Sequence, residues 1–340
     1  MQYLCLKQFA MPKKVIGIAM GGFSSEKKIS VKSGNQVYET LDKEKWKVYK
    51  IEVTSENWFV LDGDEKLPIV KNKFSFFKKN KELFFDVIFN AIHGSPGEDG
   101  KLAKILESLN VPFTSSNSKS AELTFNKKRC VDFAKENNVL TAKSILLNKN
   151  DSINIEKLIE EIKLPCFVKP NSSGSSFGIN KVKIKENLYN GIKSAFLEDS
   201  EIIIESELKG MEVSVGVYQK KDKIVTLPIT EIVSEKDFFD YEAKYQGKAK
   251  EITPANISEK LKKTINEISK DLYRKLNLKG IIRNDFIIVN DKPHLLEINT
   301  VPGLTKESII PKQLFAANIS LKELFESMLL LALNEKEKIN

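Results

Sequence analysis

Two apolar stretches late in the sequence carry polar side chains that buried strands rarely hold. Residues 281–303 read IIRNDFIIVNDKPHLLEINTVPG, where the Ile, Phe, Val and Leu content predicts two buried β-strands and NDKP predicts the turn between them. Side chains alternate between faces along a strand, so Arg283 and Asp285 share one face, as do Glu297 and Asn299. An unpaired charge is unfavourable beside Ile and Leu, so these side chains must pair with one another or bind a ligand.

The register of this hairpin is constrained if both carboxylates face the same side. Asp285 and Glu297 are separated by an even number of positions, and opposed residues with that spacing require an odd number of residues in the turn, or else a β-bulge. A regular two-residue turn without a bulge would place the two carboxylates on opposite faces. We therefore expect an irregular hairpin.

The same residues predict a metal site. Asp285, Glu297 and Asn299 offer only oxygen atoms, which suits Mg²⁺ better than zinc. The alternative is a buried ion pair between Arg283 and Asp285, with Glu297 facing solvent. Asn299 and the turn that follows favour the metal, because Gly303 leaves backbone N–H groups open to an anion.

A second motif, VKPNSSGSSFG at 168–178, places Lys169 at the end of a predicted strand and before a loop of Ser and Gly. Such loops offer backbone N–H groups and hydroxyls to phosphate oxygens, and the lysine adds a positive charge. The lysine precedes the glycines, so this is not a Walker motif. Taken alone, the segment could equally be a surface loop.

The first third of the chain alternates strands with helices. Strands are predicted at 14–22, 46–53 and 85–94, and helices at 24–41 and 97–110, with glycine turns after the first and third strands. This alternation predicts an open parallel sheet, which binds ligands at the carboxyl ends of its strands. His93 and Glu26 fall at that edge, but taken singly each is more often structural: a core histidine and a helix-start carboxylate.

The remainder predicts two further α/β units. A composition shift begins near residue 114; strands are expected at 166–170, 211–219 and 223–233, and a long helix from about Ser258. The chain of 340 residues is long enough for three domains, which we expect at 1–116, 117–206 and 207–340.

Composition excludes several classes of protein. No apolar run is long enough to span a membrane, and the first ten residues lack a secretory cleavage pattern, with Met11 as a second possible start. Cys5, Cys130 and Cys166 have no paired spacing, which argues against disulfides and zinc and favours the cytoplasm. The net charge is +8, but the lysines are scattered among glutamates on predicted helices, so we expect no nucleic-acid partner. The excess positive charge could instead attract a nucleotide.

Together these motifs resemble the D-alanine–D-alanine ligase family of the ATP-grasp superfamily. The lysine before a phosphate loop, the R-N-D and E-I-N-T-V-P-G hairpin, and HGSPGEDG occur in the family's order from about Val15 to Ser320. DYEAKY at 240–245 and the GG-S-S-E opening tie the chain to that ligase more closely than to other ATP-grasp enzymes. The resemblance implies an N-terminal sheet domain followed by two α+β domains that sandwich ATP.

It also implies roles at positions that match the family's motifs. ATP would be held by Lys127, Lys169, Ser175, Ser176, Glu205, Leu208, Glu212 and Lys244, and two Mg²⁺ ions, for which Mn²⁺ can substitute, by Asp285, Glu297 and Asn299. D-Alanine would be held by Glu26, His93 and Ser308, with Arg283 and the backbone of Gly303 at the oxyanion. Ser175 and Tyr245 would form a hydrogen-bonded link to Glu26 that closes the site.

The implied reaction joins two D-alanine molecules through D-alanyl phosphate for peptidoglycan synthesis, by a cytoplasmic homodimer. The alternatives are a D-alanine–D-lactate ligase, another ATP-grasp carboxylate–amine ligase, and an ATP-binding regulatory protein without catalysis. Tyr245 favours the dipeptide, because a neutral phenol adds no cation that would disfavour an amine.

Overall fold

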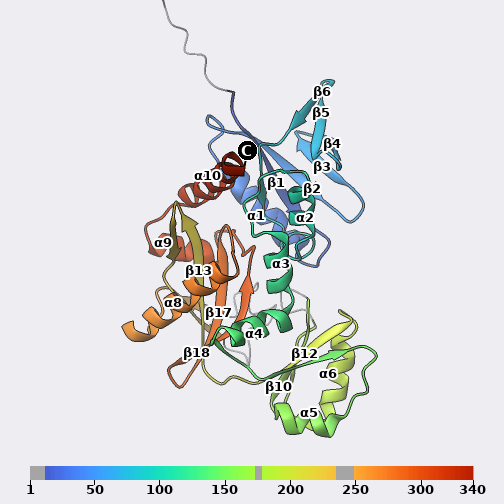
Figure 1. Ribbon diagram of the computed structural model, residues 1–340, viewed down its shortest axis with the longest axis vertical. Coiled ribbons are helices and arrows are strands. Elements are labelled where there is room, and N and C mark those ends of the chain that lie inside the picture. The colour runs from blue at the N-terminus through green and yellow to red at the C-terminus, as the bar shows by residue number, and fades with distance from the viewer. Residues whose placement is uncertain (1–11, 173–177, 235–248, 340) are drawn as a thin grey trace, which may run out of the picture.

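The computed structural model describes residues 12–172, 178–234 and 249–339. Three β-sheets follow one another along the long axis of the molecule (Figure 1). The first sheet lies at one end, the third in the middle, and the second, with four strands, at the other end. The chain therefore runs from the first sheet to the far end of the molecule and returns through the middle to the first sheet, where its C-terminus lies.

The first sheet is mixed. In spatial order its strands are β6 (Lys81–Phe84), β5 (Ser75–Lys78), β4 (Glu65–Val70), β3 (Trp58–Asp62), β2 (Lys47–Val53), β1 (Val15–Gly21) and β7 (Val87–Asn90). Strand β1 pairs in parallel with β2 and β7, as expected. The strands from β2 to β6 pair antiparallel, so the prediction of a parallel sheet holds for β1, β2 and β7 and is wrong for the rest of the sheet. Two-residue turns after β3 and β5 can only reverse the chain, and they build this meander.

Helices α1 (Lys27–Thr40) and α2 (Lys101–Ser108) follow the two glycine turns of this sheet. Both turns lie at the carboxyl ends of parallel strands, β1 and β7. The elements that the sequence predicted for this edge are thus present, and Glu26 and His93 lie on it.

The second sheet is antiparallel and small. Its strands are β11 (Asn180–Val182), β10 (Cys166–Pro170), β12 (Glu201–Ser206) and β9 (Ser144–Asn148), and its helices are α5 (Ile155–Ile162) and α6 (Leu188–Ala195), the latter after the short 3₁₀ turn η1 (Lys185–Asn187). One apolar cluster, which includes Val168, Ile192 and Ile204, fills the space between sheet and helices. Among the described residues, this cluster draws none from the other two sheets.

The third sheet has the order β16 (Ala249–Ile252), β15 (Thr230–Ser234), β13 (Met211–Lys220), β17 (Ile282–Val289), β18 (Lys292–Asn299) and β8 (Leu140–Thr141), with β14 (Lys223–Thr226) also beside β13. Helix α8 (Glu259–Lys275) covers it and begins where expected, because the Ser258 hydroxyl accepts a hydrogen bond from the backbone N–H of Leu261. Helices α3 (Ser118–Phe125) and α4 (Lys127–Glu136) pack on β18.

The first and third sheets share an apolar core. Helix α9 (Ile309–Ala316) contacts β13, and α10 (Leu321–Ile339) returns to the first sheet, as Figure 1 shows. Phe325 of α10 meets Phe89 of β7 edge to face, with ring centroids 5.3 Å apart. These two sheets therefore form one packed body, and the second sheet is attached to it.

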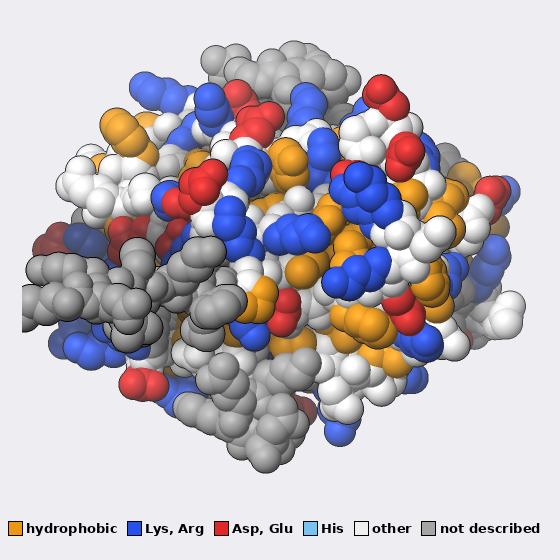
Figure 2. All heavy atoms as spheres, turned by 90° about the horizontal axis from the view of Figure 1, so that it is seen from above, with side chains coloured by type: hydrophobic (Ala, Val, Ile, Leu, Met, Phe, Trp, Pro, Cys, Tyr) orange, Lys and Arg blue, Asp and Glu red, His pale blue; other side chains and the backbone are white. Residues whose placement is uncertain are grey.

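Two surface properties complete the description. Seen from above, Lys and Arg side chains alternate with acidic and apolar ones (Figure 2). None of the helices among the described residues combines the length and apolarity needed to cross a membrane.

Candidate active site

The β17–β18 hairpin is irregular, as the spacing of its carboxylates required. Asn290 and Asp291 form a two-residue turn with φ of 49° and 57°, the conformation typical of tight hairpins. The pairing then shifts by one residue between Phe286 and Asp285, so that Leu296 is an extra, bulged residue. Of the two predicted irregularities, an odd-numbered turn or a bulge, the hairpin has the bulge; its turn is shorter than the NDKP expected, since Lys292 and Pro293 already belong to β18.

As a result of the bulge, Asp285 lies opposite Glu297 and Arg283 lies opposite Asn299. All four side chains line one cavity. The hairpin therefore presents two carboxylates, a guanidinium and an amide on one face.

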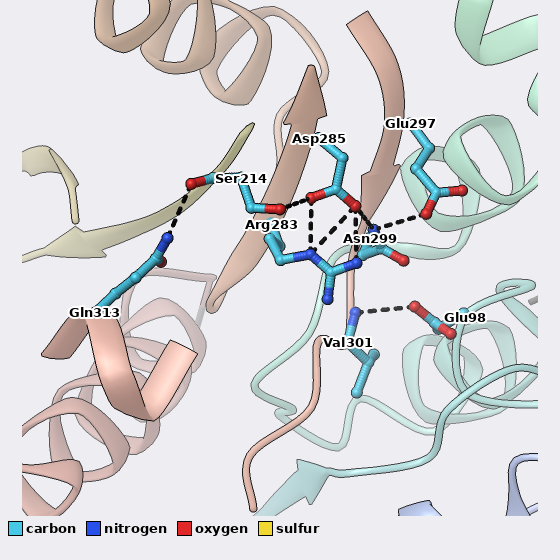
Figure 3. Close-up of polar contacts among 8 residues, drawn as sticks. All are labelled: Glu98, Ser214, Arg283, Asp285, Glu297, Asn299, Val301 and Gln313. Carbon is cyan, nitrogen blue, oxygen red and sulfur yellow. Dashed lines mark hydrogen bonds and ion pairs between the residues drawn. The ribbon is translucent and has the colours of Figure 1, made fainter. Parts of the chain in front are cut away.

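Asp285 is the centre of the polar contacts on this face (Figure 3). The Arg283 guanidinium donates to both carboxylate oxygens, Nε to Oδ1 at 2.8 Å and the terminal nitrogen to Oδ2 at 2.7 Å. The Ser214 hydroxyl on β13 donates to Oδ1, and Asn299 Nδ2 donates to Oδ2 at 3.0 Å and to Glu297 Oε1 at 3.4 Å. The ion pair of the alternative interpretation thus exists, but it is continuous with Glu297 on the cavity wall.

The second sheet contributes a buried ion pair. Lys169 Nζ lies 2.7 Å from Glu205 Oε2, and both side chains are nearly inaccessible to solvent. Burial lowers the pKa of Lys169, but attraction to Glu205, Glu297 and Glu212 outweighs it, so the pKa is raised. The resemblance implies that both residues hold ATP, and the structure places them in direct contact.

The first sheet contributes Glu26 and His93, both buried. His93 Nδ1 lies 2.6 Å from the carbonyl oxygen of Val301, which can only accept, so Nδ1 carries the proton. Its Nε2 lies 2.9 Å from the Ser33 hydroxyl, and that oxygen also accepts from the backbone N–H of Leu304 at 3.3 Å. Burial lowers the pKa of His93 and favours the neutral ring. His93 therefore holds the turn after β18.

Glu98 was not singled out by the sequence, although it belongs to HGSPGEDG. Its Oε2 accepts from the backbone N–H of Gly94 at 2.7 Å, and its Oε1 accepts from that of Val301 at 3.2 Å (Figure 3). Burial, together with the charges of Glu26 and Glu297, raises its pKa to about 8. Glu98 thus connects the first sheet's glycine turn with the turn after β18.

One cavity brings these groups together. It is lined by the predicted residues Glu26, His93, Lys127, Lys169, Glu205, Leu208, Glu212, Arg283, Asp285, Glu297, Asn299 and Gly303, and by Glu98. Ser308, at the start of α9, does not line the cavity but lies close to Gly303: a Cβ built on Gly303 would come within 2.7 Å of its hydroxyl. Ser175, Ser176, Lys244 and Tyr245 lie outside the described residues.

The geometry suits magnesium in part. Within the described part of the chain, no three His, Cys, Asp or Glu side chains gather closely enough to hold a metal by themselves. The hairpin offers two carboxylates and an amide, and Mg²⁺ typically takes one or two protein carboxylates and completes its shell with phosphates and water. The donor set therefore fits Mg²⁺ bound together with a nucleotide.

Comparison with known proteins decides the family. Residues 15–116 match the model described as D-ala D-ala ligase N-terminus, and residues 134–330 match D-ala D-ala ligase C-terminus. The chain is 50% identical to the D-alanine–D-alanine ligase of Flavobacterium johnsoniae, over 94% of this chain and 99% of that protein. The chain belongs to the D-alanine–D-alanine ligase family.

Solved structures agree with this membership. The Bacillus anthracis D-alanine–D-alanine ligase complexed with ATP is 30% identical, with a TM-score of 0.78 over 97% of this chain and 100% of that one. The VanG D-Ala:D-Ser ligase from Enterococcus faecalis is 27% identical, with a TM-score of 0.84 over 94% and 100%. The predicted family, fold class and enzyme class, a D-alanine–D-alanine ligase, are confirmed.

Family membership leaves the role of each residue open. The structure adds Ser33, Glu98 and Ser214 to the predicted set, since each contacts a member of it or the turn after β18. Glu98 could have been suspected as a second carboxylate at the ligand edge. Ser33 and Ser214 carry no signal in the sequence, because each is one serine among many in a helix or strand.

Proposed function

We propose that this enzyme joins two D-alanine molecules at the described cavity, forming D-alanyl-D-alanine, ADP and phosphate through D-alanyl phosphate. The product would serve peptidoglycan synthesis in the cytoplasm. The observation that carries the proposal is the convergence of three sheets on one cavity, which places Lys127 and Lys169, the Asp285 wall and Glu26 around a single space.

ATP would lie between the second and third sheets. Lys127 and Lys169 would contact its phosphates; the raised pKa of Lys169 keeps this ammonium charged beside them. Glu205 and Leu208 would meet the adenine and Glu212 the ribose, and all three line the cavity. Ser176 and Lys244, outside the described residues, are assigned to ATP by resemblance.

Asp285, Glu297 and Asn299 would hold two Mg²⁺ ions, or Mn²⁺, in the presence of ATP. When bound, these ions neutralise charge on the phosphates. Asp285 accepts hydrogen bonds from Arg283, Ser214 and Asn299, so these contacts would have to shift for Asp285 to bind an ion.

Glu26 would receive the ammonium group of the first D-alanine. A carboxylate oxygen of this first D-alanine would attack the γ-phosphorus of ATP, break the bond to the bridging oxygen and release ADP. The amine of the second D-alanine would then attack the acyl carbonyl. The oxyanion would form beside Arg283 and the backbone N–H of Gly303, and would collapse as phosphate leaves.

His93 would keep that oxyanion site in place. Both of its ring nitrogens are engaged with protein, one on the Val301 carbonyl, two residues before Gly303. The neutral imidazole would therefore act mainly on the turn, close to the carboxylate of the first D-alanine. Ser308, at the start of α9, would bind the carboxylate of the second D-alanine. Ser175 and Tyr245 would form a hydrogen-bonded link to Glu26.

Three further features stay predictions: the domain limits 1–116, 117–206 and 207–340, the homodimer, and the preference for D-alanine over D-lactate as second substrate. Helices α3 and α4 and strand β8 pack against β18, which groups them with the third sheet and bears on the proposed domain limit near residue 117. Sedimentation at two protein concentrations would test the dimer.

Isotope transfer tests the mechanism. D-Alanine labelled with heavy oxygen in its carboxylate should pass one label to released phosphate, because that oxygen bridges carbon and phosphorus in D-alanyl phosphate. Label retained only in D-alanine and dipeptide would contradict the intermediate. Competition between D-alanine and D-lactate at mildly acidic and mildly basic pH should give mainly dipeptide; predominant ester at either pH would favour the D-lactate ligase instead.

A further inference from the structure

Asn171 is a fully buried amide at the carboxyl end of β10, two residues beyond Lys169. Its backbone N–H donates to the carbonyl oxygen of Glu201 at 2.9 Å, and its side-chain Nδ2 donates to Glu201 Oε2 at 2.9 Å. These two bonds fix it to β12 of the second sheet. Both run to a residue that does not line the cavity.

The acceptor groups of Asn171 point the other way, to the first turn of α4. Its carbonyl oxygen accepts from the backbone N–H of Lys127 at 2.9 Å, and its Oδ1 accepts from that of Lys128 at 2.9 Å. The first N–H groups of a helix have no partner within the helix. Asn171 supplies partners for two of them from another part of the chain.

This arrangement ties two cavity walls together. Helix α4 packs on β18 of the third sheet, whereas β10 and β12 belong to the second. Lys127 is the first residue of α4, and Lys169 lies on β10. Asn171 thus joins the elements that carry the two lysines of the cavity.

Only an amide satisfies both sides. The side chain must donate to a carboxylate, Glu201, and accept from a backbone N–H, that of Lys128. Asp would accept from Lys128 but set a second negative charge against Glu201, and Ala would leave both partners unsatisfied.

We propose that Asn171 is a positioning residue for ATP: it sets the placement of Lys127 relative to Lys169, so that both ammonium groups reach the same phosphate chain. This inference rests on the proposed function for the two lysines. It predicts an effect on nucleotide affinity that is separate from any effect on D-alanine, since Glu26, between β1 and α1, and Arg283, on β17, both lie outside the second sheet.

The test compares four variants by their kinetics with ATP and with D-alanine. In Asn171→Ala, KM for ATP should rise about tenfold while KM for D-alanine changes less than about twofold. This is the size expected when the buried hydrogen bonds of one side chain are lost and only nucleotide binding depends on them. Asn171→Asp should raise KM for ATP further. The double variant Asn171→Asp, Glu201→Gln should restore it to within about threefold, because donor and acceptor have exchanged places.

Asn154→Ala is the matched control. Asn154 Oδ1 accepts from the backbone N–H of Lys157 at the start of α5, so this variant, like Asn171→Ala, removes an amide that accepts from the first turn of a helix, but away from the cavity. It should lower the melting temperature and leave both KM values unchanged.

Two results would overturn the proposal: equal changes in the two KM values for Asn171→Ala, or a double variant no better than Asn171→Asp. If Asn171→Ala fails to fold, the Asp variant and the double variant decide the question. Equilibrium binding of ADP to each protein separates this inference from the function, because it needs no ligase activity. Absence of dipeptide from the wild type would contradict only the function.

Discussion

Asp285 and Glu98 are two carboxylates on the wall of one cavity, the first buried and the second half-buried, with opposite surroundings. Asp285 meets a guanidinium that contacts both of its oxygens, a hydroxyl and an amide. Glu98 meets two backbone N–H groups and has other carboxylates nearby, and its pKa is raised to about 8. Asp285 therefore contacts a cation and two neutral donors, whereas burial and neighbouring carboxylates disfavour a negative charge on Glu98.

The difference indicates a division of tasks. A carboxylate held by a guanidinium and an amide belongs to the wall that would bind the cations, whereas a carboxyl that is readily protonated can hold two backbone segments together without adding charge. Glu98 bridges the segments after β7 and β18, at Gly94 and Val301. The following variants test the contrast.

The largest effect is expected from removing the carboxylate of Asp285. Asp285→Leu removes the carboxylate that the largely buried Arg283 guanidinium contacts through two of its nitrogens, and the free energy of unfolding should fall by about 3–5 kcal/mol. The double variant Arg283→Met, Asp285→Leu should regain most of that stability and no activity. Urea unfolding measures the stability of the two variants. If the double variant is as unstable as Asp285→Leu, the loss of stability does not come from breaking the Arg283–Asp285 ion pair.

Glu297 should matter for turnover more than for folding. Glu297→Gln keeps the shape but removes one charge of the proposed metal site, so kcat should fall about a hundredfold or more while stability changes by less than about 1 kcal/mol. Steady-state kinetics over a range of Mg²⁺ concentrations provides the measurement, with the exposed Glu65→Gln as control. Wild-type kcat in Glu297→Gln would remove this residue from the metal site.

Glu98 should make stability depend on pH. Its folded pKa of about 8 exceeds the ordinary 4.5, so between these values the folded state binds its proton more tightly than the unfolded chain. Its contribution to stability is full below about pH 4.5 and is lost as the pH rises toward about 8. The melting temperature of the wild type, without ligands, should therefore fall relative to that of Glu98→Gln between about pH 5 and about pH 8. Parallel curves for the two proteins would mean that Glu98 does not retain its proton.

The smallest effect is expected at Ser33. Ser33→Ala removes the hydroxyl that contacts His93 Nε2 and the backbone N–H of Leu304, so unfolding should become easier by about 1 kcal/mol. Ser108→Ala, which removes an exposed hydroxyl of α2, should have less effect in the same thermal unfolding series. A Ser33 variant as stable as the wild type would show that the turn is held without this contact.

The hairpin shows how far a sequence pattern reaches. The even spacing of Asp285 and Glu297 required an irregularity, and the bulge at Leu296 provides it. Its place is also visible in the sequence afterwards: Leu295 and Ile298 are both buried, although positions three apart on a regular strand face opposite sides.

Other contacts could not be derived from the pattern. Lys169 and Glu205 lie on neighbouring antiparallel strands, but a helix separates these strands in the sequence, and no periodicity sets their relative register. The β3–β6 meander was missed because its short strands are interrupted by Lys, Glu and Asn, so the apolar alternation is weak. Residue roles came from the family resemblance, which periodicity alone could not provide.

Helix α10 has a consequence for the order of folding during synthesis. Leu324, Phe325 and Leu329 belong to the same core as Ile16, Ile18 and Phe89 of the first sheet, yet α10 is translated after all three sheets. A growing chain can fold a unit only from residues that have left the ribosome. The first sheet therefore emerges with one apolar face uncovered and must wait for α10, whereas the second sheet has all of its core partners early. Nascent chains stalled before α10 should be the species that most needs a chaperone.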